Sequence, residues 1–326
     1  MTNTPVPWPT RRRNDDGSEP NAIAFAQIDP TSVCDLHCTY CVGREWTQAH
    51  MKAETFDAAI DQLPRLRYVQ LQGEGEPMLA RRFWSHLERL RELGVEVGFT
   101  TNGRHLTNQS VERLVALGVR TVAVSIDSLE PDLYRELRGD DVALAVAGVD
   151  RLAAARCGDM DVFITSVLTQ ATFATFDEII AFSEELGLSP PSCQGLQRNP
   201  SYVRHYRDLT LATDGLDPAQ QAWVGEYARS RSDHRRTKGL QSYYEAITAA
   251  AGAEDRCPFV RSTVHIRFDG AIFPCCFMKE DHQAMGNLSR SRLNDVSIRS
   301  QRNHLLDEIQ RGGTPPACRG CHVLAN

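Results

Sequence analysis

The sequence predicts an α/β fold built on a partial (β/α)6 barrel, followed by a smaller C-terminal module. Strand-like and helix-like segments alternate six times along the chain, which requires a parallel sheet with right-handed crossovers. No glycine-rich dinucleotide-binding fingerprint is present, so we favour a partial barrel over a doubly wound sheet. The length of 326 residues suits one large core plus a smaller unit.

Short apolar segments mark the predicted strands, and segments with apolar residues at helical spacing separate them. We expect strands at 23–28, 68–72, 95–100, 121–126, 162–168 and 192–196. Helices are expected at 81–93, 108–117 and 176–186, and Gly94, Gly118 and Gly187 follow them where a left-handed C-cap is needed. In a barrel of this type, functional residues gather at the C-terminal ends of the strands.

These segments divide the chain into four parts. Residues 1–20 are rich in Pro, Arg and Asp and are expected to form a flexible arm. The barrel is expected to occupy residues 21–197, and a polar connecting segment with helices at 218–230 and 240–251 occupies 198–256. Residues 257–326 form a cysteine-bearing domain, in which 263–268 and 271–277 flank a hairpin turn at Asp269-Gly270.

Composition excludes several classes of function. The net charge is −6, from 36 basic and 42 acidic residues, so the basic excess that nucleic-acid binding needs is absent. No apolar run of about 18 residues occurs, and no charged-then-apolar segment opens the chain, so neither a membrane span nor a secretory signal is expected. We therefore expect a cytoplasmic protein with no nucleic-acid or membrane partner.

Ten cysteines are concentrated toward the two ends of the chain. They are Cys34, Cys38, Cys41, Cys157, Cys193, Cys257, Cys275, Cys276, Cys318 and Cys321. Clustered thiols in a reducing compartment bind metal more often than they form disulfides. The two clusters therefore predict two metal sites, each of which could hold zinc or iron–sulfur until the spacing decides.

Cys34, Cys38 and Cys41 follow the first predicted strand with the spacing C-x3-C-x2-C. Three thiolates on one loop can ligate three irons of a [4Fe–4S] cube and leave the fourth iron open, as catalytic metal centres do. Zinc fits this loop poorly, because its fourth ligand would have to be His37, whose position beside Cys38 would strain the loop.

This loop resembles the hallmark of the radical S-adenosylmethionine (SAM) superfamily. The resemblance implies that SAM chelates the open iron and is cleaved by an electron from the cluster, releasing a 5′-deoxyadenosyl radical. It also implies SAM-binding roles after the following strands, in Gly73-Glu74-Gly75-Glu76-Pro77, Thr101-Asn102-Gly103, Ser125-Ile126-Asp127 and Arg138-Gly139. The residues expected to bind SAM are Tyr40, which would pack on adenine, Gly73, Gly75, Glu76, Asn102, Ser125, and Arg138, which would bind the SAM carboxylate.

The second cluster combines Cys257 and Cys275, in the pattern C-x12-G-x4-C, with the pair Cys318 and Cys321. Four thiolates suit zinc and [4Fe–4S] alike. The pattern is similar to the start of the SPASM and twitch auxiliary domains of radical SAM enzymes. A chain whose last cysteine is Cys321 resembles the shorter twitch form, which implies one fully ligated auxiliary [4Fe–4S] cluster.

The resemblance also suggests a reaction. Twitch enzymes of this pattern include epimerases and dehydrogenases of aminoglycoside-type sugars and aminocyclitols in antibiotic biosynthesis, as well as maturases, whereas many SPASM relatives modify peptides. The short N-terminal arm leaves no room for a leader-recognition domain, which favours a small carbohydrate-like substrate. We expect hydrogen abstraction at a carbinol carbon, followed by epimerisation.

Cys193 is the expected hydrogen-atom donor, because it belongs to neither cluster and lies on the sixth strand, where alternate side chains point into the barrel. Cys276 is the fallback donor, and His205, in the polar run after Cys193, is a candidate base. Three alternatives remain open: dehydrogenation with the auxiliary cluster as electron acceptor, peptide modification, and a non-catalytic zinc or iron–sulfur protein. A flavodoxin or ferredoxin-type protein is the expected electron donor.

Overall fold

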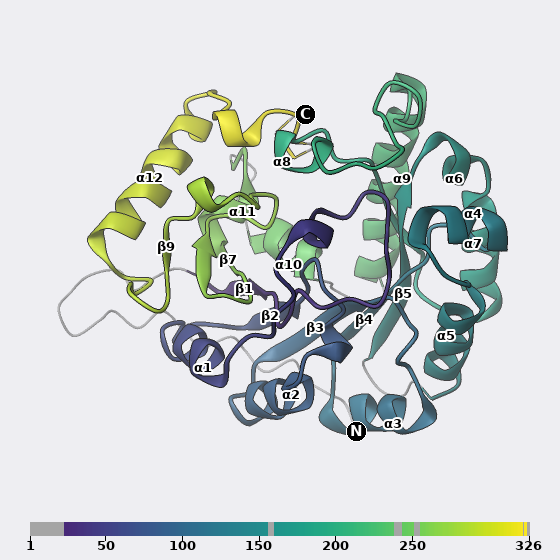
Figure 1. Ribbon diagram of the computed structural model, residues 1–326, viewed down its shortest axis with the longest axis horizontal. Helices are drawn as coiled ribbons and strands as arrows, with labels where there is room; N and C mark the ends of the chain where they lie inside the picture. The colour runs from purple at the N-terminus through teal and green to yellow at the C-terminus, as the bar shows by residue number, and fades with distance from the viewer. Residues whose placement is uncertain (1–22, 156–159, 238–242, 251–254, 322, 325–326) are drawn as a thin grey trace.

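The computed structural model describes residues 23–155, 160–237, 243–250, 255–321 and 323–324. Within them the strands form one sheet in the order β6-β5-β4-β3-β2-β1-β7-β8-β9 (Figure 1). The first six strands are β1 (Phe25–Ile28), β2 (Tyr68–Leu71), β3 (Glu96–Thr101), β4 (Thr121–Ser125), β5 (Asp161–Leu168) and β6 (Ser192–Gly195). All six run parallel, so the predicted α/β barrel sheet is confirmed.

The register of the pairing gives the sheet two faces, because residues paired across parallel strands point to the same side. One row contains the fully buried Ile28, Leu71, Phe99 and Val122, which belong to the main apolar core. The opposite face carries a more polar row, formed by Gln27, Gln70, Gly98 and Thr121. The apolar face is the outer one, covered by helices, and the polar face is the inner one.

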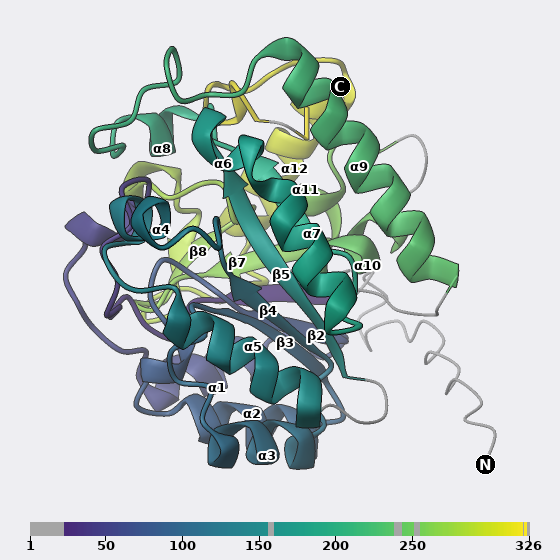
Figure 2. The same ribbon diagram turned by 90° about the vertical axis from the view of Figure 1, so that its right-hand side faces the viewer.

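Five of the helices that follow the strands cover the outer face (Figures 1 and 2). They are α1 (Ala53–Asp61), α2 (Phe83–Glu92), α3 (Asn108–Leu117), α5 (Ala143–Ala155) and α7 (Phe176–Glu185). The glycines expected to cap three of them, Gly94, Gly118 and Gly187, have φ of +67°, +70° and +61°. Left-handed backbone costs glycine little, so these residues end the helices where the sequence predicts.

Two shorter helices lie closer to the carboxyl ends of the strands: α4 (Pro131–Arg138) and α6 (Gln170–Ala174). Turns of 3-10 helix occur at Val42–Glu45, Pro77–Leu79, Asp281–Gln283 and Pro316–Cys318. No helix within the described residues is both long and apolar enough to cross a bilayer.

The segment after β6 does more than connect two domains. It contains α8 (Pro200–Val203), α9 (Pro218–Thr237) and α10 (Tyr243–Ala250). The Tyr243 ring packs against Phe25 and Tyr68 of the inner face, with centroids 6.4 and 5.7 Å apart. Helix α9 lies along β6, and its fully buried Arg235 pairs with Asp161 at the start of β5. This segment therefore closes one end of the inner face.

The C-terminal part continues the barrel sheet. It consists of α11 (Pro258–Ser262), β7 (Thr263–Ile266), β8 (Ala271–Phe273), β9 (Gly286–Asn287) and α12 (Val296–Gln310). The predicted hairpin is present, with β7 and β8 antiparallel and Gly270 at φ +86° in the turn. In addition, β7 pairs in parallel with β1, Phe25 opposite Thr263 and Ile28 opposite Ile266, which local patterns do not predict.

Two expectations lie outside the described residues: the N-terminal arm at 1–20 and Cys157. The predicted helix at 240–251 is described only in part, as α10. The boundaries proposed between barrel, connecting segment and C-terminal domain stay predictions.

Candidate active site at the carboxyl ends of the strands

The loop after β1 carries Cys34, Cys38 and Cys41 as free, half-buried thiols. Backbone bonds fasten this loop to α4, where His37 N–H donates to the Arg138 carbonyl at 3.0 Å and Thr39 N–H to the Leu137 carbonyl at 2.9 Å. Burial raises the pKa of all three thiols, that of Cys34 to about 12; Cys38 further raises the pKa of Cys34 and Cys41, and Cys34 that of Cys41. These sulfurs are therefore gathered in one place, and binding iron would displace their protons.

Asp35, within the same loop, is a site residue that the sequence analysis missed. Its carboxylate accepts hydrogen bonds from Asn102 Nδ2 at 2.7 Å and Arg104 Nη1 at 3.1 Å, and it contacts His105 Nε2 at 2.9 Å. These three partners follow β3, so Asp35 ties the cysteine loop to the end of that strand. The contact fixes the Asn102 side chain, whose predicted role in SAM binding stays a prediction.

The loop at Gly73 and Gly75 packs directly against the chain that leaves β1. A Cβ at Gly73 would lie 2.3 Å from Asp29 Cγ, and one at Gly75 would lie 2.3 Å from the Thr31 carbonyl oxygen. Only glycine allows so close an approach. Close packing thus explains why both positions are glycine. From the sequence alone, they are expected only to expose backbone to SAM.

Glu76 is buried, and its carboxylate accepts three hydrogen bonds from the protein itself. The donors are Met78 N at 3.1 Å, Thr101 Oγ1 at 2.8 Å and Asn102 N at 2.7 Å. Burial raises the pKa of this carboxyl group, against the effect of those donors. Glu76 therefore holds the loops after β2 and β3 together, which positions the glycines rather than presenting a free carboxylate.

Arg138 and Tyr40 meet at Asp127, one of the most deeply buried acidic groups. Arg138 Nε and Nη2 each donate to Asp127 at 2.8 Å, Tyr40 Oη also donates to Asp127, and Val167 N–H donates at 2.8 Å. Burial alone would lower the pKa of Arg138, but Asp127 raises it well above its usual range, so the guanidinium is charged. Two donors of Arg138 are thus committed to Asp127, and its predicted contact with the SAM carboxylate stays a prediction.

The structure corrects the position of Cys193. In the register of β5 and β6, Cys193 pairs with Ser166, on the same face as Ile164 and Leu168, which face the outer helices. Its thiol packs against the main apolar core, and burial raises its pKa to about 12. The inner-face residues of β6 are Ser192 and Gln194. The expectation that Cys193 points into the barrel is therefore wrong by one residue, whereas Ser125 does lie on the inner face, at the end of β4.

The second set of cysteines lies in a separate buried cluster. Cys257, Cys275, Cys276, Cys318 and Cys321 are all buried, and burial raises the pKa of Cys257, Cys318 and Cys321. Close packing with the segment after β6 holds the C-terminal pair: a Cβ at Gly320 would lie 2.5 Å from the Arg198 carbonyl oxygen, and Asn199 Nδ2 donates to the Ala317 carbonyl at 2.7 Å.

Cys276 lies beside Cys275 and interacts with it. A hydrogen bond between the two thiols lowers the pKa of Cys276 and raises that of Cys275. Cys275 Sγ also accepts a hydrogen bond from Phe277 N at 3.4 Å. The predicted role of Cys276 as a hydrogen donor stays a prediction.

The donor chemistry fits iron–sulfur clusters better than single metal ions. Among the described residues, no three Cys, His, Asp or Glu side chains are arranged to hold one ion between them. A zinc ion needs four donors at about 2.0–2.3 Å from one point. A cubane cluster takes one thiolate for each iron, so its thiols need not converge on a single point. Two groups of free thiols, the first half-buried and the second buried, supply such donors.

His205 lies between carboxylates and is nearly buried. Its Nδ1 is 2.9 Å from Glu45 Oε2 and its Nε2 is 3.8 Å from Glu280 Oε1, while Arg204 also pairs with Glu280. Glu45 follows the first cysteines, and Glu280 follows β8. His205 therefore joins three segments of the site, and its predicted role as a base stays a prediction.

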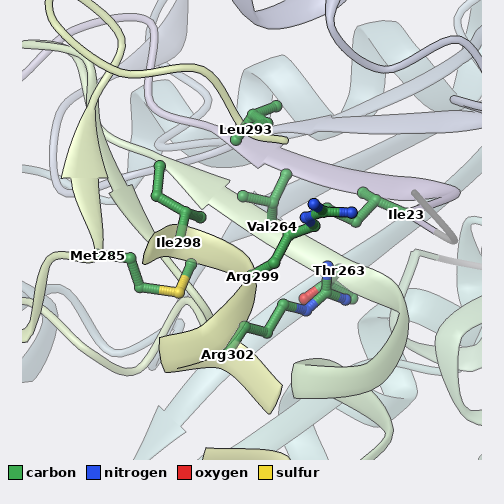
Figure 3. Close-up of a pocket in the computed structure, with 8 residues that line it drawn as sticks. All are labelled: Ile23, Thr263, Val264, Met285, Leu293, Ile298, Arg299 and Arg302. Carbon is green, nitrogen blue, oxygen red and sulfur yellow. The ribbon is translucent and has the colours of Figure 1, made fainter. Parts of the chain in front are cut away.

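A small apolar pocket lies away from these residues (Figure 3). Ile23, Thr263, Val264, Met285, Leu293 and Ile298 line it, together with Arg299 and Arg302 of α12. None of the predicted site residues contributes to it. The candidate active site is thus the region between the two cysteine groups.

Comparisons with known families identify the two cysteine-bearing parts of the chain. The model of the radical SAM superfamily matches residues 28–183, and that of the SPASM iron–sulfur cluster-binding domain matches residues 257–322. The chain therefore contains a radical SAM domain followed by a SPASM iron–sulfur cluster-binding domain. This combination of domains is that of the SPASM/twitch subgroup of the radical SAM superfamily, and it implies SAM, a radical SAM [4Fe–4S] cluster and an auxiliary iron–sulfur cluster.

Relatives differ in how much of the chain they match. A GTP 3′,8-cyclase of Caulobacter vibrioides is 35% identical over 161 residues, 45% of this chain and 44% of the cyclase. The chain thus spans less than half of that relative. The mycofactocin maturase MftC of Mycobacterium tuberculosis is 25% identical over 301 residues, 89% of this chain and 73% of the maturase.

Solved structures share the fold. SuiB of Streptococcus suis, bound to its precursor peptide SuiA, superposes with a TM-score of 0.67 at 17% identity, covering 93% of this chain and 76% of SuiB. Native anSMEcpe with bound AdoMet gives a TM-score of 0.65 at 16% identity, covering 92% of this chain and 90% of that one. At these identities the likeness is one of fold.

Proposed function

We propose that this protein is a maturase that modifies a peptide, by abstracting a hydrogen atom from one of its C–H bonds. The observation that carries this proposal is the extent of the match to mycofactocin maturase MftC, which covers 89% of this chain. The match to the cyclase covers 45%. The solved structures of the same fold include SuiB with a precursor peptide and anSMEcpe with two peptides, which supports a peptide substrate.

Two arguments from the sequence favour a carbohydrate-like substrate and epimerisation. One is the length of the N-terminal arm, which lies outside the described residues. The other is Cys193 as a hydrogen donor inside the barrel, and the register of β6 places that thiol on the outer face. With Cys193 on the outer face, epimerisation would depend on Cys276, the fallback donor.

We assign the residues of the site as follows. Cys34, Cys38 and Cys41 would hold the cluster that binds SAM, and Cys257, Cys275, Cys318 and Cys321 would hold the auxiliary cluster. When bound, the first cluster supplies the electron that cleaves SAM. Asp35, Glu76 and Asp127 keep the loops after β1, β2, β3 and β4 in one arrangement around that position. A flavodoxin or ferredoxin-type protein would deliver the electron.

The inner face carries amide side chains of the kind that suit a peptide substrate; Gln27 and Gln70 are buried and Gln72 is half-buried. Gln70 Nε2 donates to Gln72 Oε1 at 3.1 Å and to Thr100 Oγ1 at 3.2 Å, so these three side chains form a polar group on adjacent strands. Gln27 Nε2 donates to the Gln72 carbonyl at 2.9 Å. Amide side chains both donate and accept hydrogen bonds, as peptide backbone requires.

The test begins with anaerobic reconstitution, where two cubane clusters should give about eight irons per chain. The holoenzyme, with SAM and a strong reductant, is then offered a synthetic peptide library or a panel of aminocyclitols and aminosugars. We expect peptides to stimulate 5′-deoxyadenosine formation and to change in mass. Stimulation by the carbohydrates alone, with a mass change of zero or minus two hydrogens, would refute the peptide proposal and restore the epimerase or dehydrogenase.

A further inference from the structure

A buried ion pair connects the two cysteine groups. Lys279 Nζ lies 3.0 Å from Glu74 Oε1, and the two side chains are 3% and 14% exposed. Lys279 follows β8 and the second group of cysteines, whereas Glu74 belongs to the glycine loop after β2. Lys279 is one of three lysines in the chain, with Lys52 and Lys238. Lys279 was not expected from the sequence to have a role, and Glu74 was expected only as part of the glycine motif after the second strand.

Glu74 reaches the first cysteine group. Its Oε2 lies 3.6 Å from Cys41 Sγ, and its carbonyl oxygen lies 3.7 Å from the same sulfur. Close packing holds Glu74 there, because a Cβ at Gly43 would lie 2.2 Å from Glu74 Cβ. Glu74 therefore places a carboxylate, paired with Lys279, beside the sulfur that is proposed to hold iron.

Lys279 follows Cys275 by four residues, directly after a turn in which Met278 N–H donates to the Cys275 carbonyl at 3.2 Å. Burial alone would lower its pKa, but Tyr202, Glu74, Asp29 and Cys276 together raise it well above its usual range, so the side chain carries a positive charge. The same charge acts on Cys276, next to Cys275. Its backbone is fixed on both sides, since Gln283 Oε1 accepts from Lys279 N at 2.9 Å and Arg267 Nη1 donates to its carbonyl at 3.4 Å.

We infer that Lys279 and Glu74 set the reduction potentials of the two clusters in opposite directions, Lys279 raising that of the auxiliary cluster and Glu74 lowering that of the cluster on Cys41. Reduction adds one electron, and so one negative charge, to a [4Fe–4S] cluster. A fixed ammonium stabilises the reduced form and a fixed carboxylate destabilises it, most strongly where water is excluded. The pair would thus keep the auxiliary cluster the easier of the two to reduce. This inference rests on the cluster ligands proposed above.

The experiment is a reductive titration of the reconstituted full-length enzyme, followed by electron paramagnetic resonance. Lys279→Met should shift the midpoint potential of the auxiliary cluster to a more negative value, and Glu74→Gln should shift that of the SAM-binding cluster to a more positive value. Lys279→Arg should keep the wild-type potentials. Lys52→Met is the matched control. It removes one exposed lysine charge far from Lys279 in the sequence, and it should change the midpoint potential of neither cluster.

Each single variant leaves one buried charge without its partner, which can prevent folding. The double variant Glu74→Gln/Lys279→Met removes both charges and should show both shifts. The alanine triple variant of Cys34, Cys38 and Cys41 retains only the auxiliary cluster, so its potential can be measured alone with and without Lys279.

Iron content and the response of the signal to SAM are measured first. Missing clusters in the wild-type enzyme would refute the proposed ligand sets, and with them the proposed function. Two intact clusters whose potentials stay the same in both the single and the double variants would overturn this inference alone, as would an equal shift in Lys52→Met.

Discussion

Asp127 accepts both ends of the Arg138 guanidinium, Nε and Nη2 each at 2.8 Å, in a position where the carboxylate has no exposed surface. The pair joins the end of β4 to the end of α4, the helix that holds the cysteine loop. Asp127 also receives Tyr40 Oη and Val167 N–H. One carboxylate thereby fixes four segments beneath the predicted SAM site.

Asp127→Asn should therefore destabilise the protein strongly. The change leaves the buried Arg138 charge without a counter-ion, which costs about 3–5 kcal/mol. Urea unfolding followed by circular dichroism measures this loss. Asp132→Asn, which breaks an exposed pair between Asp132 and Arg135, is the control and should cost less than about 1 kcal/mol. Equal losses in the two variants would contradict the role given to Asp127.

Gly73→Ala should abolish most SAM cleavage. The added Cβ would meet Asp29, which His265 Nε2 holds at 2.8 Å, so the glycine loop must move instead. A displacement of about 1 Å near the reacting centre can cost on the order of 100-fold in rate. The rate of 5′-deoxyadenosine formation under reducing conditions measures the effect. At Gly94 a Cβ meets nothing within 4 Å, so Gly94→Ala strains only the backbone and should leave the rate unchanged.

Cys193→Ala should leave the chemistry intact. Because this thiol packs against the outer core, its loss should cost roughly 1 kcal/mol of stability and no activity. Product formation by the variant, compared with wild type at equal iron content, tests this. A variant that loads both clusters and cleaves SAM, yet makes no product, would show that Cys193 takes part in the reaction after all.

The stability of the protein should depend on His86 between neutral and mildly acidic pH. Its ring stacks on Phe56 at 3.9 Å, neither ring nitrogen has a hydrogen-bond partner within the described structure, and burial lowers its pKa to about 4. The unfolded chain has the higher histidine pKa, about 6.5, so unfolding takes up a proton between these values. Stability from this residue is thus present above pH 6.5 and is lost as the pH falls toward 4.

The loss from pH 7 to pH 5 should amount to roughly 2 kcal/mol. His86→Phe should remove that contribution, so the difference in stability between wild type and variant should grow as the pH falls. Thermal unfolding at pH 7 and pH 5 provides the comparison. If the difference in stability between wild type and variant is the same at both pH values, His86 does not take up a proton on unfolding.

The sequence predicts the strands well because their signals are local. Apolar segments, helical spacing and C-cap glycines place six strands within two residues of their observed positions. Local signals do not determine on which face of the sheet Cys193 lies, because this depends on the register between β5 and β6. A shift of one residue exchanges the two faces.

Contacts between segments that are far apart in the chain also could not be predicted from the sequence. The spacing of the cysteines identifies two groups of thiols, but nothing near Glu74 or Lys279 indicates that these residues meet. The same holds for His205, which pairs with Glu45 and Glu280 from two other segments. Such pairs form only after the sheet brings its loops together, so the polar network around the site became visible only in three dimensions.

Because β7 pairs in parallel with β1, the C-terminal domain is part of the barrel sheet and covers its first strand. A truncated chain ending before Cys257 would expose the backbone N–H and C=O groups of Phe25–Ile28 along a bare strand, and such strands pair readily with other molecules. Removal of the C-terminal domain should therefore yield an aggregated protein and not an active barrel. Substitution of individual cysteines is the better way to study each cluster site without the other.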